Sequence, residues 1–396
     1  MKFKNKGRKI YKTKEKNYYG KSPVGKVLSG ALTVLLIGGI GFIGYSVAEP
    51  IINYTKHKGD EPTAAETPIT EPASTEAAVT TRIVETKAVE TTVVVVESDH
   101  YSAAMLKETD LTDIDALKSA IDAIPKEDVI GYIEVPLKTN GGSVNYASIV
   151  NEAQTAIKST LTLEEIVGEI EKNGFKSAAV ISVFRDNSVP VTFPDTGYVL
   201  AADGSPWADS QGKLWASPYA QRTIDYNSAI VQELSFTGID MIICSDMVFP
   251  DFTEDDLQQL DPVLGKSDRC MAMTSAANLL FNNAVSGGSD MRIEVSAVDI
   301  LQGRKDILQP MLLSQNKIIV NIDVSSLVNG VAIGDVLYEF EGSPSQMVEQ
   351  CLVRINADIA DFNVTLKITG ASLPASEVVS IKKIAEDYGC EVYVIS

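Results

Sequence analysis

The sequence predicts an α/β fold, in which a (β/α)8 barrel follows one transmembrane helix and a disordered linker. Three observations carry this prediction: an uncharged apolar run near the N-terminus, a long stretch rich in Thr, Glu and Pro after it, and eight strand-like runs separated by helical patterns. We divide the chain into a basic tail (1–26), the transmembrane helix (27–48), the linker (49–99) and the barrel (100–396).

The N-terminal segment is predicted to anchor the protein in a membrane. Residues 1–26 contain ten basic side chains and one acidic side chain, Glu15, so this tail carries 10 − 1 = +9. Residues 27–48 carry no charge, and as a helix they would span about 33 Å, enough to cross a bilayer core. The positive-inside rule then places the tail in the cytoplasm and the C-terminal domain outside the cell membrane. A signal peptide cleaved after Ala48 is the alternative, although the apolar run exceeds the ~7–15 residues usual for one.

The linker and the overall charge exclude one class of function. Residues 56–98 are rich in Thr, Glu, Ala, Val and Pro, a composition that cannot bury a core, so we expect an extended spacer. The whole chain carries −19, so the part after the tail carries −19 − 9 = −28. A nucleic-acid binder needs basic surface to release phosphate counterions, and we therefore exclude that class.

Histidine and cysteine usage limits the chemistry of the barrel. The two histidines, His57 and His100, both precede the first predicted strand. Catalysis by Ser-His-Asp or Cys-His and zinc sites with histidine ligands are thereby excluded. The four cysteines have no metal-ligand spacing, and Cys244 and Cys390 are expected to pack as small apolar residues. We predict no metal and no cofactor, so any catalysis must use carboxylates, hydroxyls and basic side chains.

Eight apolar runs are predicted to form parallel strands, because helical patterns lie between them. Eight such units over about 300 residues indicate a closed (β/α)8 barrel, the TIM barrel, with a doubly wound open sheet as the alternative. Its active site would lie at the C-terminal ends of the strands. The predicted strands are 101–106, 129–136, 177–184, 240–249, 291–300, 317–324, 363–369 and 391–395.

The helices between these runs have clear boundary signals. Thr162 with Glu165 forms a capping box, and an apolar stripe at helical spacing follows it. Ser343 with Gln346 forms another, with a proline at the first helical position. Gly238 and Gly389 fit the C-terminal ends of helices that precede a strand.

The connection after the third strand, 185–225, is about 40 residues, well above the usual ~2–6. It contains both tryptophans of the chain, Trp207 and Trp215, together with Tyr219 and several aspartates. Aromatic faces suit the apolar C–H groups of sugar rings, and carboxylates accept hydrogen bonds from sugar hydroxyls. The alternative is that the tryptophans form a small core of the loop itself.

An ordered series of motifs lies in the segments 135–146, 183–186, 201–209, 215–219, 225–227, 238–240 and 249–250. This series resembles a family of bacterial glycoside hydrolase domains. The resemblance covers roughly residues 129–250 and implies a TIM barrel related to the alpha-amylase clan.

The fourth strand departs from the pattern of this family. The family typically ends this strand with Phe-Asp-Tyr-Val-Arg-Phe-Pro, whereas residues 244–250 read Cys-Ser-Asp-Met-Val-Phe-Pro. Aligned on the final Phe-Pro, the family aspartate falls on Ser245 and the arginine on Val248, and Asp246 follows one position later. In a strand that shift turns a side chain to the opposite face. Asp246 can replace the lost carboxylate only if a bulge or the strand end re-aims it.

Hydrolysis of a glycosidic bond usually needs two carboxylates in one cleft. We predict Asp246 with Asp299, from neighbouring strands, as the catalytic pair. The competing interpretation is that Asp299 is solvated or caps a helix, while Asp246 pairs with Arg185 or Lys138. The side chains predicted to bind the glycan are Lys138, Arg185, Asp186, Trp207, Trp215 and Tyr219.

Three functions stay open at this point. The first is a membrane-anchored glycoside hydrolase acting on cell-wall or extracellular polysaccharide. The second is a catalytically degenerate barrel that binds a glycan or a protein in the cell envelope, and the altered fourth strand slightly favours it. The third is a structural or signalling component whose basic tail binds anionic lipid or a cytoplasmic partner.

Overall fold

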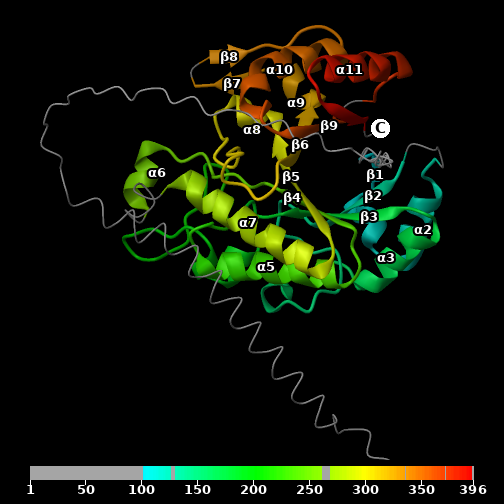
Figure 1. The fold of residues 1–396 in the computed structure, drawn as a ribbon. Helices are drawn as coiled ribbons and strands as arrows, with labels where there is room; N and C mark the ends of the chain where they lie inside the picture. The colour runs from blue at the N-terminus through cyan, green and yellow to red at the C-terminus, as the bar shows by residue number, and fades with distance from the viewer. Residues whose placement is uncertain (1–100, 126–129, 261–267, 335, 371, 395–396) are drawn as a thin grey trace, which may run out of the picture. The chain divides into compact units, whose positions relative to one another are not determined.

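The computed structural model describes residues 101–125, 130–260, 268–334, 336–370 and 372–394 (Figure 1). The predicted basic tail, transmembrane helix 27–48 and linker 49–99 lie outside these residues. Within the described ranges, no helix has both the length and the apolar character that a membrane crossing requires.

Eight strands pair side by side and in parallel to form one sheet. All eight correspond to predicted runs. Their order in the sheet is β1 (Ala103–Met105), β2 (Tyr132–Lys138), β3 (Lys176–Ser182), β4 (Met241–Ser245), β5 (Asp290–Ser296), β6 (Lys317–Asp323), β9 (Asn363–Thr369) and β10 (Glu391–Val394).

Two strands end earlier than the sequence pattern predicts. The fourth was expected to run to Phe249, but β4 stops at Ser245 because Asp246 takes a left-handed backbone with φ 54°. The fifth was expected to run to Ile300, but β5 stops at Ser296 because a short helix, α8 (Ala297–Leu301), begins there. Apolar residues continue past both strand ends, and this continuity made the runs look longer.

The sheet is curled, so that side chains from distant strands meet inside it. Lys367 on β9 lies 2.7 Å from Glu134 on β2, although four strands separate β2 from β9 in the sheet. In a flat sheet those two strands would be about 24 Å apart. Arg292 on β5 likewise lies over the ring of Tyr101, which immediately precedes β1. This curl gives a barrel-like sheet, but closure is not seen: among the described strands, β1 and β10 form the two edges of the sheet and do not pair, so it is a half-barrel and not the closed barrel that the sequence predicts.

The interior of the curled sheet combines an apolar layer with buried charges. The apolar layer consists of Tyr101, Ala103, Ala178, Met241, Ile243 and Ile319. Beside it, Lys367 forms ion pairs with Glu134 and with Glu294, at 2.7 and 2.9 Å between Nζ and the carboxylate oxygens. Burial alone would lower the pKa of Lys367, but these two carboxylates outweigh it and hold that pKa above its ordinary value. Buried charges destabilise a protein unless partners of opposite charge and hydrogen bonds compensate them, as these ion pairs do.

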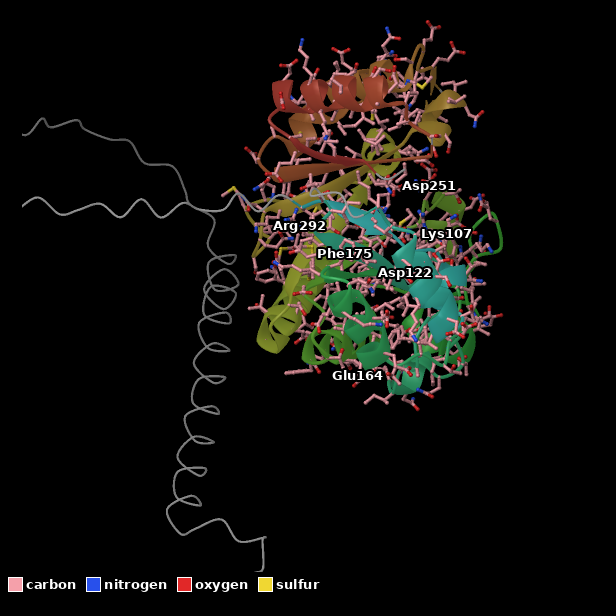
Figure 2. The ribbon with its side chains drawn as sticks, turned by 90° about the vertical axis from the view of Figure 1, so that its right-hand side faces the viewer. Lys107, Asp122, Glu164, Phe175, Asp251 and Arg292 are labelled. Atoms are coloured by element: carbon pink, nitrogen blue, oxygen red, sulfur yellow. The ribbon has the colours of Figure 1, made fainter. Side chains whose placement is uncertain are left out.

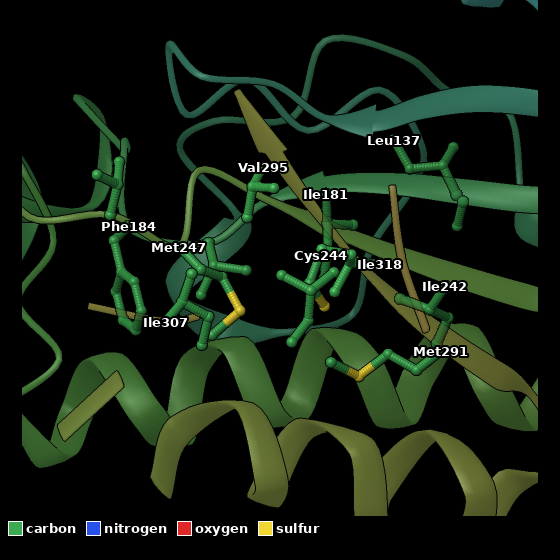
Figure 3. Close-up of a cluster of buried hydrophobic side chains, with 14 of the residues drawn as sticks. Leu137, Ile181, Phe184, Ile242, Cys244, Met247, Met291, Val295, Ile307 and Ile318 are labelled. Carbon is green, nitrogen blue, oxygen red and sulfur yellow. The ribbon is translucent and has the colours of Figure 1, made fainter. Parts of the chain in front are cut away.

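The outward faces of the strands pack against helices. Figure 1 shows α2, α3, α5 and α7 on one side of the strands and α10 and α11 on the opposite side. Figure 3 shows Ile242, Cys244 and Met291, which belong to the larger hydrophobic core between these outward faces and the helices. The longer helices are α2 (Ile114–Asp122), α3 (Leu163–Lys172), α5 (Gln221–Phe236), α7 (Arg269–Gly287), α10 (Pro344–Ile359) and α11 (Ala375–Asp387).

The predicted helix boundaries are confirmed. Thr162 Oγ1 accepts from the amide of Glu165, whose carboxylate accepts from the amide of Thr162, so α3 begins with a capping box. Ser343 and Gln346 form the same arrangement at the start of α10. Gly238 and Gly389 take positive φ angles of 94° and 67° just after α5 and α11.

Several short elements were not predicted. An antiparallel hairpin, β7 (Val331–Ile333) with β8 (Val336–Tyr338), follows α9 (Val324–Val328). The side chains of β8 are exposed and only Val331 of β7 is buried, so the hairpin is too short to give an alternating pattern. The remaining unpredicted short elements are η2 (Glu108–Leu111), η3 (Asn151–Ala153), α4 (Val189–Thr192) and η4 (Pro194–Thr196). A further short helix, α6 (Glu254–Gln259), begins with the acidic turn 254–256 that is typical of a helix start.

The C-terminal ends of the strands share one end of the sheet. Lys107 and Asp251, which follow β1 and β4, lie toward that end in Figure 2, whereas Phe175, which precedes β3, lies away from them. All four cysteines are free, and Cys244, Cys351 and Cys390 are buried, as expected for small apolar residues.

Candidate functional site

The C-terminal ends of the strands surround a cavity of about 480 Å³. A volume of this size lies within the range of small-molecule binding sites. In parallel barrels this end carries the active site, because the loops after the strands converge there. The residues lining it from successive strand ends include Asn140, Arg185, Asp246, Glu294, Asp299, Asn321, Asp323 and Thr369.

Asp246 reaches this cavity because the backbone turns at the end of β4. Among the described residues it is the one non-glycine residue with a positive φ. Aspartate tolerates this left-handed conformation better than most residues do. The strand end therefore re-aims Asp246, and its Oδ1 lies 3.3 Å from Nη1 of Arg185. The pairing of Asp246 with Arg185 belongs to the competing interpretation given by the sequence.

The surroundings of Asp246 favour its protonated form. Burial raises the pKa of this carboxyl, and the negative charges of Asp299 and Glu294 raise it further. The guanidinium of Arg185 works in the opposite direction, but the net effect is a raised pKa. A raised pKa is the direction of shift that a carboxyl acting as a general acid needs.

Asp299 lies in the first turn of α8 and lines the same cavity as Asp246. Its carboxylate forms an ion pair with Arg304. The structure thus brings the two predicted catalytic carboxylates into one cavity, and each of them has an arginine partner. Asp299 neither caps a helix with its side chain nor stands fully in solvent.

Sequence reasoning missed Glu294, a third carboxylate of the cavity. Glu294 accepts a hydrogen bond from Asn321 at 2.9 Å and pairs with Lys367. A signal was present: Arg292, Glu294 and Ser296 alternate with apolar residues along β5, which indicates a polar inner face.

Asp323, at the end of β6, also lines the cavity, but it caps α9. Burial would raise the pKa of this carboxyl, and hydrogen bonds from Ser325 and Ser326 outweigh it, so the pKa is lowered. A carboxylate with a lowered pKa and these internal partners is a poor proton donor.

Lys138 and Asp186 were predicted to bind the glycan, but the structure buries them beneath the site. Their side chains are fully buried and pair at 2.9 Å between Nζ and Oδ2. Burial opposes the ionised form of Asp186, but Lys138 and the amides of Val189 and Ser188 outweigh it and lower the pKa. Neither residue lines the cavity. The pair therefore joins the segments after β2 and β3 instead of contacting a ligand.

Trp207 belongs to a small core of the long loop, which was the alternative interpretation. Its indole is buried, donates to Asp256 at 2.9 Å and lies against the rings of Tyr198 and Phe252. Tyr219 packs on Phe249, with the ring centres 5.7 Å apart, and it does not line the cavity either.

Trp215 occupies a different position, beside Arg185. Its indole nitrogen donates to Asp209 at 2.9 Å, and the guanidinium of Arg185 lies 4.9 Å from its ring centre. A guanidinium over an indole face is held by cation–π attraction. A chain of contacts therefore runs from Asp209 through Trp215 and Arg185 to Asp246. Trp215 acts on the site through Arg185 in this arrangement.

Within the described ranges, no group of three or more His, Cys, Asp and Glu side chains has an arrangement that could hold a metal ion.

Comparisons with known proteins assign the chain to a family. The family described as "Putative glycosyl hydrolase domain" matches residues 104–324, more than half of the chain. The chain therefore belongs to this family, and the predicted resemblance to glycoside hydrolase domains is confirmed. Among curated proteins, no relative matches the chain.

Solved structures of similar fold include glycoside hydrolases. A hypothetical protein from Ruminiclostridium thermocellum is 18% identical, with 48% of this chain and 96% of that one covered and a TM-score of 0.41. The PgaB (BpsB) glycoside hydrolase domain from Bordetella bronchiseptica is 12% identical, with 75% and 94% covered and a TM-score of 0.48. Alpha-L-fucosidase isoenzyme 2 from Paenibacillus thiaminolyticus is 15% identical, with 75% and 46% covered and a TM-score of 0.47. The family assignment rests on the family match and not on these structures.

Proposed function

We propose that the protein hydrolyses glycosidic bonds in cell-wall or extracellular polysaccharide, with Asp246 as general acid and Asp299 as the second carboxylate. One observation carries the proposal: Asp246, re-aimed by its left-handed backbone, has a raised pKa and shares a cavity with Asp299. Such a pair of carboxyl groups, one protonated and one ionised, is the usual equipment of a glycoside hydrolase.

The two carboxyl groups have different tasks in this proposal. Protonated Asp246 gives its proton to the oxygen of the leaving sugar while the glycosidic bond breaks. Ionised Asp299 either attacks the anomeric carbon itself or takes a proton from the water that attacks it. Water supplies the remaining hydroxyl and proton in both cases. Arg304 pairs with Asp299 and would hold its carboxylate in place.

The location outside the cell is also part of the proposal. The basic tail 1–26 and the uncharged run 27–48 support a single-pass anchor, and the linker 49–99 would hold the barrel away from the membrane. Protease treatment of intact cells tests this arrangement. We expect loss of the C-terminal domain and protection of the tail.

One observation favours a binding module as the second candidate. Asp246 and Asp299 each form an ion pair with an arginine, Arg185 and Arg304 respectively. Carboxylates held in this way could be purely structural, and the barrel would then bind a glycan or a protein without cleaving it.

The test is a hydrolysis and binding screen of the full chain on envelope polysaccharides, with Asp246→Asn beside the wild type. We expect Asp246→Asn to lower turnover by about 10²–10⁴-fold, because an amide cannot donate a proton to the leaving oxygen. Asp195→Asn is the matched control, since Asp195 is exposed and pairs with Arg222 away from the cavity. Full turnover in Asp246→Asn would contradict the proposed mechanism. Binding without turnover in the wild type would support the binding module.

A further inference from the structure

A second cavity, of about 650 Å³, adjoins the first. The two cavities share Asn140, Arg185 and Arg304 in their linings, so they meet at the two arginines that pair with the candidate catalytic carboxylates. The long loop supplies one wall of the second cavity, from Asp209 to Trp215, and the start of α6 supplies another. This cavity takes no part in the proposed chemistry.

The charges around the second cavity are balanced. Three acidic residues, Asp209, Asp251 and Asp256, face three basic ones, Arg185, Lys213 and Arg304. Two of the acids already have internal partners, because Asp209 accepts from the indole of Trp215 and Asp256 accepts from the indole of Trp207. The lining thus has no excess charge to select a cationic or an anionic ligand.

Uncharged polar side chains complete the lining. Asn187, Ser210, Gln211 and Gln302 lie around the cavity and can bind hydroxyl groups. Each cavity alone lies within the range for one small ligand. A ligand that fills both must therefore be an extended molecule that passes the two arginines.

We infer that the second cavity is a saccharide-binding subsite, which holds uncharged sugar units of the same glycan chain whose neighbouring units enter the first cavity. This inference rests on the proposed function for the nature of the ligand. It adds that the substrate is an oligosaccharide segment of a polymer and that single sugars and disaccharides bind weakly.

Calorimetry with the full chain carrying Asp246→Asn tests the inference without turnover. The probes are the disaccharide and the hexasaccharide of β-1,4-linked N-acetylglucosamine and of α-1,4-linked glucose. We expect at least one hexasaccharide to bind more than about 10-fold more tightly than its disaccharide, which corresponds to about 1.4 kcal/mol.

Ser210→Trp, added to the same background, should remove this advantage. Ser210 is exposed and lines the second cavity but not the first, so a tryptophan there fills the subsite without touching the carboxylates. Ala202→Trp is the matched control, since Ala202 is exposed on the same loop and lines neither cavity. We expect Ala202→Trp to keep the full length dependence.

Several outcomes would overturn the inference. These are equal affinities for disaccharide and hexasaccharide, no binding of either hexasaccharide, or an unchanged length dependence in Ser210→Trp. A de-N-acetylated hexasaccharide that binds more tightly, with an affinity that falls steeply with salt, would show that the subsite selects charge and would overturn the uncharged class. Length-dependent binding in a protein without turnover would retain the subsite and reject hydrolysis.

Discussion

Arg185 connects the long loop to the carboxyl group on which the proposed chemistry depends. It touches the ring of Trp215 on one side and pairs with Asp246 on the other. A cation beside a carboxyl lowers its pKa, so Arg185 limits how far burial can raise the pKa of Asp246. The loop therefore influences the pH range of the site through Arg185, which lines the cavity.

Arg185→Gln should move the pH profile toward alkaline values. Without the guanidinium, the pKa of Asp246 rises further, and a general acid stays protonated to higher pH. The high-pH limb of kcat/KM should shift upward by about 1 unit, the lower end of the effect of a neighbouring charge. Trp215→Leu should shift it in the same direction by less, because Arg185 remains but loses its support.

Trp207→Leu is the control for this pH profile, because Trp207 packs in the same loop without contacting Arg185. A limb that stays in place in Arg185→Gln, or moves to lower pH, would show that Arg185 does not govern Asp246.

At the scale of single residues, the sequence predicted two carboxylates that the structure brings into one cavity, but it did not predict how they are held. Asp246 and Asp299 were predicted and do share a cavity. The left-handed φ of Asp246 could not be predicted, because one backbone angle leaves no periodic trace in the sequence. The pairing of Lys138 with Asp186 was also missed, since Lys138 ends β2 while Asp186 follows β3, and the two meet only in the folded chain.

The turn after β2 brings Gly142 close to the buried pair of Lys138 and Asp186. Gly142 has a φ of 81°, and a Cβ placed on it would lie 2.2 Å from Oδ1 of Asp186. Asp186 uses this oxygen to accept from the amides of Ser188 and Val189, which begin α4. The glycine therefore allows the connections after β2 and β3 to lock together.

Gly142→Ala should destabilise the protein by about 3 kcal/mol or more, the cost of disrupting a buried ion pair. Urea unfolding of the full chain measures the change. Gly204→Ala is the matched control, because Gly204 has a φ of 72° and nothing lies within 4 Å of its Cβ position. That control should lose only about 1–2 kcal/mol, the cost of a left-handed alanine. Equal losses in the two variants would show that the contact with Asp186 is unimportant.

At the scale of elements, the sequence was most successful. All eight strands were predicted because each is a buried apolar run between helical patterns, and α3 and α10 were predicted because their capping boxes are local. The β7–β8 hairpin was missed because each strand has three residues and β8 is exposed, so the one buried side chain, Val331, gives no recognisable pattern. Local signals predict elements well where burial or capping fixes the residue type.

The buried charges inside the sheet bind distant parts of the molecule together. Lys367 is the shared partner of Glu134 and Glu294, which come from β2 and β5. Lys367→Met would leave two carboxylates inside the barrel without their cation. We expect a loss of about 3–5 kcal/mol in the free energy of unfolding, measured by urea denaturation.

Lys172→Met is the control for this substitution, because Lys172 pairs with Glu169 on the exposed surface of α3. Surface pairs of this kind contribute about 0–1 kcal/mol. If Lys367→Met were no more harmful than Lys172→Met, the interior ion pairs would not contribute to stability.

For the whole molecule, the strand count predicted a closed barrel, and the curled parallel sheet agrees with its barrel-like part, although the edge strands β1 and β10 are not paired in the described residues. The charged interior was not predicted, because Lys367 and Glu134 are 233 positions apart and no local pattern joins them. In the sequence, the charged residues of β5 and β9 are recognisable only as parts of strands. Residues so far apart in the sequence can be recognised as partners only once the curl of the sheet is known.

That separation has a consequence for how the chain acquires its structure during synthesis. A ribosome completes β2 and β5, with Glu134 and Glu294, long before it reaches Lys367 on β9. Contacts between such distant residues form slowly, because a large loop must close before they stabilise anything. The segment matched by the family, 104–324, also ends before Lys367. A nascent chain that ends at residue 324 would contain every candidate catalytic carboxylate but would lack Lys367, the cation that pairs with Glu134 and Glu294. The final steps of folding therefore wait for the last strands to emerge.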